Sequence, residues 1–168
     1  ELKEVLVRVA SLACSHAGNA SVADIHISIA PDMGNLIVDE VAFRRIMVNL
    51  ISNALKFRTD DPRVIVRAGL HGDGQPFIAV RDFGAGMTED QCKRAFEAFY
   101  QGDPDLSRKQ GGTGLGLTLS RHLAKLHDGD VLLKSRAGIG TTAMLVLPAE
   151  AHTKVRSDVP ASDAQDAA

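Results

Sequence analysis

The stretch NLISNALKFR, residues 49–58, combines the apolar pattern of a buried helix with two asparagines and a lysine. Around it, apolar side chains recur at the spacing of one helix face: Phe43, Ile46, Met47, Leu50, Ile51, Ala54 and Leu55. Asn49, Asn53 and Lys56 fall on a second, narrower stripe within an arc of about 60°. A polar stripe of this kind is often a solvated helix face, so a function for it needs support from other parts of the chain.

The composition is that of one globular domain. The chain has 168 residues, of which 45% are hydrophobic and 24% charged, and its net charge is -2. This charge gives no electrostatic argument for nucleic acid. No apolar run approaches the roughly 18 residues of a membrane span, and two unspaced cysteines favour a reducing compartment. We therefore expect a cytoplasmic domain without nucleic-acid or membrane contact, and a natural protein that continues upstream of Glu1.

Hydrophobic periodicity and turn residues predict alternating groups of helices and strands. Helices are expected over 1–17, 39–57, 88–99 and 113–127, and strands over 25–29, 64–70, 77–82, 131–136 and 141–147. Two hairpins and the irregular order exclude a doubly wound parallel sheet. The prediction is an α+β fold, a two-layer α/β sandwich whose mixed, mostly antiparallel sheet has helices on one face. Residues 1–148 form this domain, and 149–168, poor in apolar residues, form a disordered tail.

Two segments rich in glycine add chemistry to this frame. RDFGAGM, residues 81–87, places Asp82 at a strand end ahead of Gly84 and Gly86, where a carboxylate can accept a hydrogen bond from the amine of an adenine lying against the backbone. An ordinary turn is the alternative. GGTGLGL, residues 111–117, follows a polar loop (101–112) that we expect to be mobile, and it opens a helix whose free N–H groups suit phosphates. It matches neither a P-loop nor a dinucleotide fingerprint.

Together, these three segments resemble the ATP-binding catalytic domain of bacterial sensor histidine kinases, within the superfamily that includes type II topoisomerases and mismatch-repair ATPases. The resemblance covers residue 2 to Pro148 and includes RAFEAFYQGD (94–103) and GIGTTAMLVLP (138–148). It implies the Bergerat ATP-binding fold, with ATP and Mg2+ as cofactors.

The resemblance also implies roles for the polar stripe and for the glycines. Asn53 would hold a magnesium ion on the ATP phosphates, because a hard cation that keeps its waters needs few protein ligands. Lys56 would lie near the phosphates as a counter-charge, and Asn49 would support the site. The phosphate-facing segment would be Gly112, Thr113, Gly114, Leu115 and Gly116.

On the adenine side, the resemblance makes Asp82 the acceptor of the adenine amine, with Gly84 and Gly86 allowing close approach of the base. Thr142 corresponds to a threonine that helps bind this carboxylate or its water. Tyr100 lies near the nucleotide in some relatives, but Gln101 follows it where many carry arginine. We expect Arg108 or Lys109, in the loop that follows, to take the place of that arginine. The paired Phe96 and Phe99 match the family's phenylalanine box, and we expect them in the core.

Three functions follow from the resemblance. Hydrolysing relatives carry a glutamate general base where this chain has Asn49, which argues against an ATPase of the chaperone or DNA-repair type. A histidine kinase needs no such base, since the acceptor imidazole is already nucleophilic. None of the six histidines has the family's acceptor pattern, so the acceptor is expected on an upstream dimerisation domain, with a response regulator receiver domain as an indirect partner. A regulatory pseudokinase that binds nucleotide without phosphotransfer remains the alternative.

Overall fold

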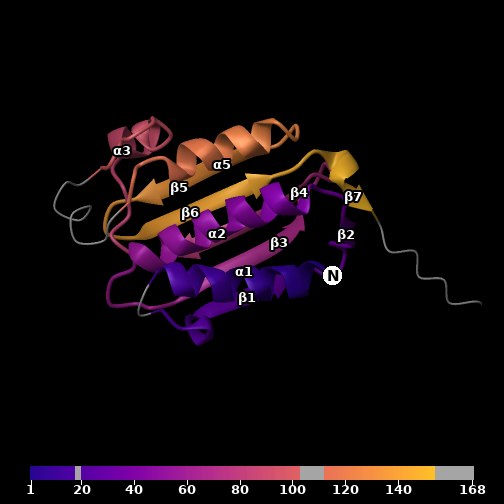
Figure 1. The fold of residues 1–168 in the computed structure, drawn as a ribbon, viewed down its shortest axis with the longest axis horizontal. Helices are drawn as coiled ribbons and strands as arrows, with labels where there is room; N and C mark the ends of the chain where they lie inside the picture. The colour runs from indigo at the N-terminus through magenta and orange to yellow at the C-terminus, as the bar shows by residue number, and fades with distance from the viewer. Residues whose placement is uncertain (18–19, 103–111, 154–168) are drawn as a thin grey trace, which may run out of the picture.

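The computed structural model describes residues 1–17, 20–102 and 112–153 (Figure 1). Its centre is a five-stranded sheet in the order β1 (Ile25–Ile29), β3 (Val64–Leu70), β4 (Pro76–Asp82), β6 (Gly140–Val146) and β5 (Asp130–Arg136). Only the β1–β3 pair is parallel within this sheet, and the other neighbours are antiparallel. The predicted mixed, mostly antiparallel sheet is confirmed.

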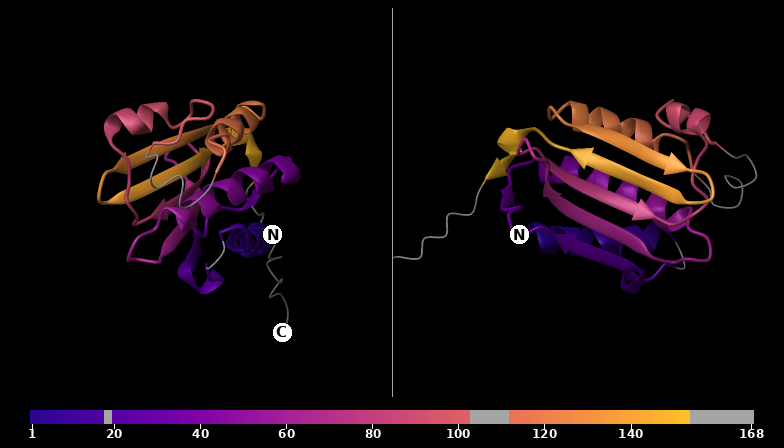
Figure 2. Two further views of the ribbon diagram at one scale, coloured as in Figure 1. Left: turned by 60° about the vertical axis from the view of Figure 1, so that its left-hand side comes forward. Right: turned by 180° about the vertical axis from the view of Figure 1, so that it is seen from behind.

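Three helices cover one face of the sheet: α1 (Leu2–His16), α2 (Glu40–Lys56) and α5 (Gly116–Lys125). Figure 2 shows the two layers from the side and the strands uncovered from behind. In Figure 1, α2 lies between α1 and α5. Two smaller elements are the 3-10 turn η1 (Val22–Asp24) and the short helix α3 (Glu89–Arg94), which lies toward one end of β5.

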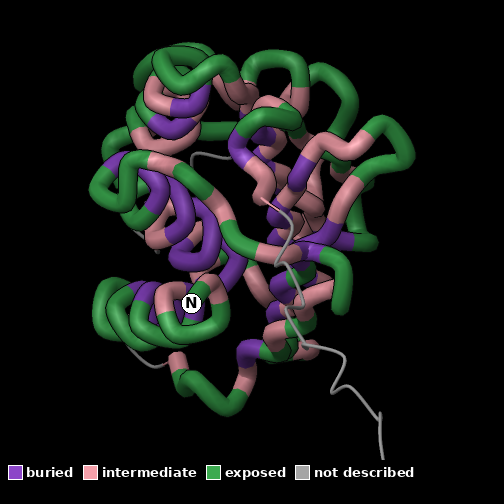
Figure 3. The backbone as a smooth tube through the Cα atoms, turned by 90° about the vertical axis from the view of Figure 1, so that its right-hand side faces the viewer, coloured by how far each residue is buried: buried purple, intermediate pink, exposed green. Residues whose placement is uncertain are grey.

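The core lies between the helices and the sheet, as Figure 3 shows. Strand residues alternate, so that Val64, Val66, Ile78 and Val80 face the helices and are at most 1% exposed. The apolar stripe predicted for α2 is buried along its whole length, from Phe43 to Leu55. Burial of this stripe fixes the rotation of α2, and therefore also the direction of its polar stripe.

The ends of α2 follow from local chemistry. Asp39 caps the first turn, where its carboxylate accepts a 2.7 Å hydrogen bond from the Ala42 N–H. Lys56 stands in the last turn, where a cation is favoured by the helix dipole. The Phe57 N–H closes the helix on the Asn53 carbonyl at 3.0 Å.

Two helices are shorter than the sequence predicts. The helix expected over 88–99 begins with a Thr88 capping box but ends at Arg94. Beyond it, the Phe99 N–H donates to the Gly114 carbonyl at 3.0 Å, and Phe99 adopts a φ of 63°. This long-range pairing breaks the helical pattern. The helix expected over 113–127 is α5, Gly116–Lys125, because Gly114 at a φ of 69° lies outside the helical region.

The predicted tail begins too early. Ala149–Ala151 form a 3-10 turn (η2), and His152–Thr153 form β7, which pairs antiparallel with β2 (Asn35–Leu36). The Ala151 carbonyl also accepts from the Ile37 N–H at 2.8 Å. These are backbone interactions, which side-chain composition does not reveal. Residues 154–168 lie outside the described part of the chain.

Among the described residues, no helix is both long and apolar enough to cross a bilayer.

Candidate functional site

Asp82 ends β4 as a buried carboxylate, with 5% of its surface exposed. Its Oδ1 accepts two backbone N–H groups, from Gly84 at 2.9 Å and from Thr141 at 3.1 Å. Within the described residues, Oδ2 has no hydrogen-bond partner, yet it is not among the fully buried unpaired atoms. Burial raises the pKa of this carboxyl above its ordinary value, and the two N–H groups offset part of that rise. Asp82 therefore keeps one oxygen available to a ligand.

Thr141, and not Thr142, is the threonine at this carboxylate. Besides its N–H contact with Asp82, its hydroxyl lies 2.8 Å from the Ser135 Oγ, which also accepts from the Met87 N–H at 2.9 Å. The predicted Thr142 lies opposite Arg81 on the uncovered face of the sheet. The alternation of side chains along the strand could have identified Thr141, because it lies on the same inward side as Ala143 and Leu145.

Gly84 and Gly86 allow close packing of the chain against itself. A Cβ at Gly84 would overlap the Phe57 carbonyl oxygen at the end of α2, and one at Gly86 would overlap the Arg136 carbonyl oxygen. Gly86 also has a φ of 64°, which disfavours other residues. Gly84 therefore lets the loop after Asp82 pack against the end of α2, and Gly86 lets it pack against the end of β5. Their predicted contact with an adenine stays a prediction.

We expect Gly86→Ala to destabilise the domain more than Gly74→Ala does. Both glycines have positive φ, which costs an alanine about 1 kcal/mol, but Gly74 has no atom within 4 Å of the added Cβ. The difference between the two losses in urea unfolding measures the overlap with Arg136, and we expect it to be at least about 1 kcal/mol. Equal losses would contradict the close packing described above.

Asn49 joins α2 to α5. Its Nδ2 donates to the buried Ser120 Oγ at 2.9 Å, and its Oδ1 faces the Gly116 Cα, where a Cβ would overlap it. Ser120 did not stand out in the sequence, because a lone serine in a helix carries no signal. The start of α5 is therefore held beside the polar stripe of α2.

Asn53 and Lys56, one and two turns further along α2, are half-buried. Neither side chain has a hydrogen bond or an ion pair with another described residue. The structure describes no cluster of three or more His, Cys, Asp or Glu side chains suited to a metal. The amide oxygen of Asn53 can nevertheless coordinate Mg2+ if phosphate and water oxygens complete the coordination shell of the ion. The residues present thus fit a magnesium ion brought in with a phosphate ligand.

Backbone and side-chain contacts join the two ends of the segment that the structure leaves undescribed between 102 and 112. The Gln101 Nε2 donates to the Gly112 carbonyl at 2.9 Å, and these residues lie two positions after Phe99 and two positions before Gly114. The Tyr100 ring lies 4.2 Å from the Arg94 guanidinium. Thr113 and Leu115 flank Gly114 and are exposed. Gly111, Arg108 and Lys109 lie outside the described residues.

The phenylalanine pair divides between two environments. Phe96 packs against the core, and its carbonyl accepts from the Thr118 hydroxyl at 2.9 Å, which ties it to α5. Phe99 is 72% exposed, so the prediction that both are core residues is wrong for Phe99. Its positive φ turns the chain toward Gly114 and its side chain outward.

These parts form one continuous arrangement. The Asp82 loop contacts the end of α2 at Phe57, Asn49 contacts α5 at Gly116, and Gly114 pairs with Phe99. A buried carboxylate, an open amide, a lysine and a helix start preceded by glycines thus adjoin one another. This set offers an acceptor for a base at one side and donors for phosphates at the other.

Comparison with known families agrees with this geometry. Residues 38–151 match the model described as "Histidine kinase-, DNA gyrase B-, and HSP90-like ATPase". The chain belongs to this family.

Curated relatives place this ATPase-family domain among sensor histidine kinases. An uncharacterised sensor-like histidine kinase of Rhizobium meliloti is 35% identical over 82% of this chain, and the circadian input-output kinase CikA of Synechococcus elongatus is 37% identical over 66%. The sensor-like histidine kinase SenX3 of Mycolicibacterium smegmatis is 36% identical over 77%. The matched part spans only 26%, 14% and 34% of these three proteins.

Solved structures confirm the fold. Full-length ShkA, crystallised with AMPPNP, has a TM-score of 0.73 and 28% identity, covering 92% of this chain and 31% of that one. The mycobacterial sensor histidine kinase MprB has a TM-score of 0.68 over 88% of this chain and 93% of that one. At 24% identity, the second match speaks for the fold alone. The predicted histidine kinase ATPase fold, the Bergerat fold, is therefore confirmed.

Proposed function

We propose that this domain binds ATP with Mg2+ and transfers the γ-phosphoryl group to a histidine on a dimerisation domain outside this chain. The observation that carries the proposal is Asp82, a buried carboxylate with one oxygen committed to backbone donors and the other available. An ionised acceptor in a largely dry position suits the exocyclic amine of adenine. Family membership and the AMPPNP-bound relative support the same ligand.

The phosphate end of the proposed ligand would lie between α2 and the start of α5. Asn53 would hold a magnesium ion, which supplies charge neutralisation on the phosphates when bound. Lys56 adds a compact positive charge one turn away. The backbone N–H groups at the start of α5, preceded by Gly112 and Gly114, would face the phosphate oxygens.

The proposed chemistry is positioning with charge neutralisation. At the position where hydrolysing relatives carry a general base, this chain has Asn49. Its amide cannot act as a base, and it already donates a hydrogen bond to Ser120. A histidine acceptor attacks without such a base, so the site's residues need only bind, orient and exclude water.

We place the acceptor outside this chain. His127, the one histidine followed by an acidic residue, is exposed just past the C-terminal end of α5, whereas the glycines precede its N-terminal end. The curated relatives are several times longer than the matched part, which leaves room for a dimerisation domain. A receiver domain would then take the phosphoryl group from that histidine.

The test mixes the chain with γ-labelled ATP, Mg2+ and the dimerisation segment of its own full-length protein. Label on that segment that is lost in acid and kept in base would establish histidine phosphorylation. Binding of a non-hydrolysable ATP analogue without any transfer would favour the pseudokinase. Asn53→Ala serves as the inactive control.

A further inference from the structure

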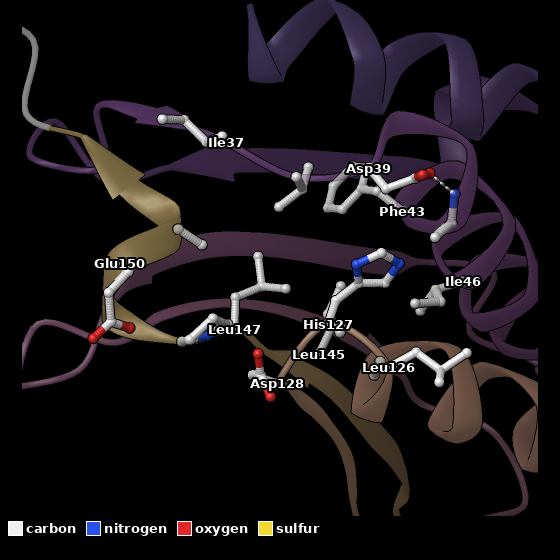
Figure 4. Close-up of a pocket in the computed structure, with 15 residues that line it drawn as sticks. Ile37, Asp39, Phe43, Ile46, Leu126, His127, Asp128, Leu145, Leu147 and Glu150 are labelled. Carbon is white, nitrogen blue, oxygen red and sulfur yellow. Dashed lines mark hydrogen bonds between the residues drawn. The ribbon is translucent and has the colours of Figure 1, made fainter.

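A groove of about 400 Å3 lies at the other end of α2 from the proposed nucleotide site. Figure 4 shows side chains reaching it from the first turns of α2, from the end of α5 and from the segment after β6. Its floor is apolar and well packed: Phe43, Ile46, Leu145 and Leu147 are at most 5% exposed. Well-packed side chains of the fold therefore form the floor of the groove.

Two apolar side chains of the groove remain exposed. Ile37 is 69% exposed and Leu126 is 65% exposed, and both line the same groove. They come from the segment before α2 and from the end of α5, so they flank the floor from different elements. Exposed apolar side chains on two sides of a concave apolar floor suggest an interaction site.

The charge around the groove has one sign. Of the 15 lining residues, Asp39, Asp128 and Glu150 are acidic and none is lysine or arginine. One oxygen of Asp39 caps α2, and no ion pair joins any of the three to a described residue. The nearby Lys125 is directed to Asp130, at 3.6 Å. A partner must therefore match an apolar floor and an acidic rim.

We propose that this groove docks an amphipathic helix whose apolar face is flanked by lysine or arginine, supplied by another protein segment. Helix-in-groove binding fits walls formed by helix ends and a 3-10 turn. Strand addition does not fit, because β6, which leads into the groove, is already paired with β4 and β5. An anionic lipid surface is disfavoured by the acidic rim.

The test uses the 168-residue chain without nucleotide and a synthetic peptide of about 18 residues. The probe carries leucines at i, i+3, i+4 and i+7 with flanking lysines, so that it forms a basic amphipathic helix. One control peptide has glutamates in place of the lysines, and another has the same residues in scrambled order. Fluorescence anisotropy gives the affinities, and amide NMR shifts locate the contact.

We expect the lysine peptide to bind with shifts confined to the groove, and to bind more weakly in high salt. The double variant Ile37→Ser with Leu126→Ser should weaken binding at least about tenfold, and Glu150→Lys at least about fivefold. Leu132→Ser is the matched control, because Leu132 is 47% exposed on the uncovered face of the sheet. It should leave binding unchanged.

Three results would overturn the proposal. Equal binding of the glutamate or scrambled peptide would remove the claimed specificity, and groove variants that bind normally would remove the claimed location. Concentration-dependent dimerisation in sedimentation, abolished by Leu126→Ser, would assign the groove to a second copy of this chain. None of these results bears on nucleotide binding, which is measured separately.

Discussion

Asp82→Asn is expected to weaken ATP-analogue binding about 30- to 150-fold while the domain stays folded. Both backbone donors bind Oδ1, so the amide oxygen of asparagine can replace it, and Nδ2 takes the place of Oδ2. A donor would then face the amine of adenine. The variant loses a charge-assisted hydrogen bond and instead places two N–H donors face to face, which costs about 2–3 kcal/mol of binding free energy. Isothermal calorimetry with a non-hydrolysable analogue measures the change.

The stability of this variant separates binding from folding. Because folding raises the pKa of Asp82, the ionised carboxylate opposes folding, and this cost sets in as pH rises through the ordinary value of 3.8 toward the folded pKa. At neutral pH the asparagine variant should therefore unfold in urea at the same or a higher concentration than the wild type. If Asp82→Asn failed to fold, the negative charge of Asp82 would itself be needed to stabilise the loop that follows it.

A nucleotide with a different purine tests whether residue 82 contacts the amine of adenine. Inosine triphosphate carries a carbonyl where adenine carries the amine, so Asp82→Asn should bind it better than it binds ATP, reversing the wild-type preference. In the wild type, affinity for the ATP analogue should fall as pH is lowered through a pKa above 3.8, since protonation removes the acceptor. If Asp82→Asn bound ATP as tightly as the wild type does, the proposed role of Asp82 in binding adenine would be wrong.

Asn53→Ala is expected to abolish the magnesium dependence of nucleotide binding. The proposed metal loses its one protein ligand, so affinity with Mg2+ should fall at least about tenfold, to the value measured in EDTA. The side chain is half-buried without a partner among the described residues, and alanine is the better helix former. Stability should therefore stay within about 0.5 kcal/mol of the wild type or rise slightly.

Asn49→Ala is the matched control, one turn earlier on the same stripe. It removes the bond to Ser120, which is 2% exposed, and leaves a buried hydroxyl unpaired at a cost of about 1–3 kcal/mol. We expect reduced stability with the magnesium dependence retained. If Asn53→Ala unfolded the domain, Asn53 would be a structural residue and its proposed role as metal ligand would be wrong.

Much of this fold follows from local pattern. The stripe from Phe43 to Leu55 predicted α2 and its buried face, and alternation in 64–70 and 77–82 predicted the central hairpin. Turn residues and the irregular order of elements then indicated a two-layer sandwich. These features depend on neighbours in sequence, so the sequence by itself determined the main helices and strands of the two layers and the polar stripe.

Contacts between distant segments decided the rest. The Phe99–Gly114 pair ended a helix that the local pattern would have continued, and the pairing of β7 with β2 ordered residues that composition assigns to a tail. The place of Thr141 at Asp82, the bridge from Asn49 to Ser120 and the acidic groove likewise join residues far apart in the chain. Backbone hydrogen bonds and close packing across such separations carry no periodic signal, so only the tertiary structure could assign them.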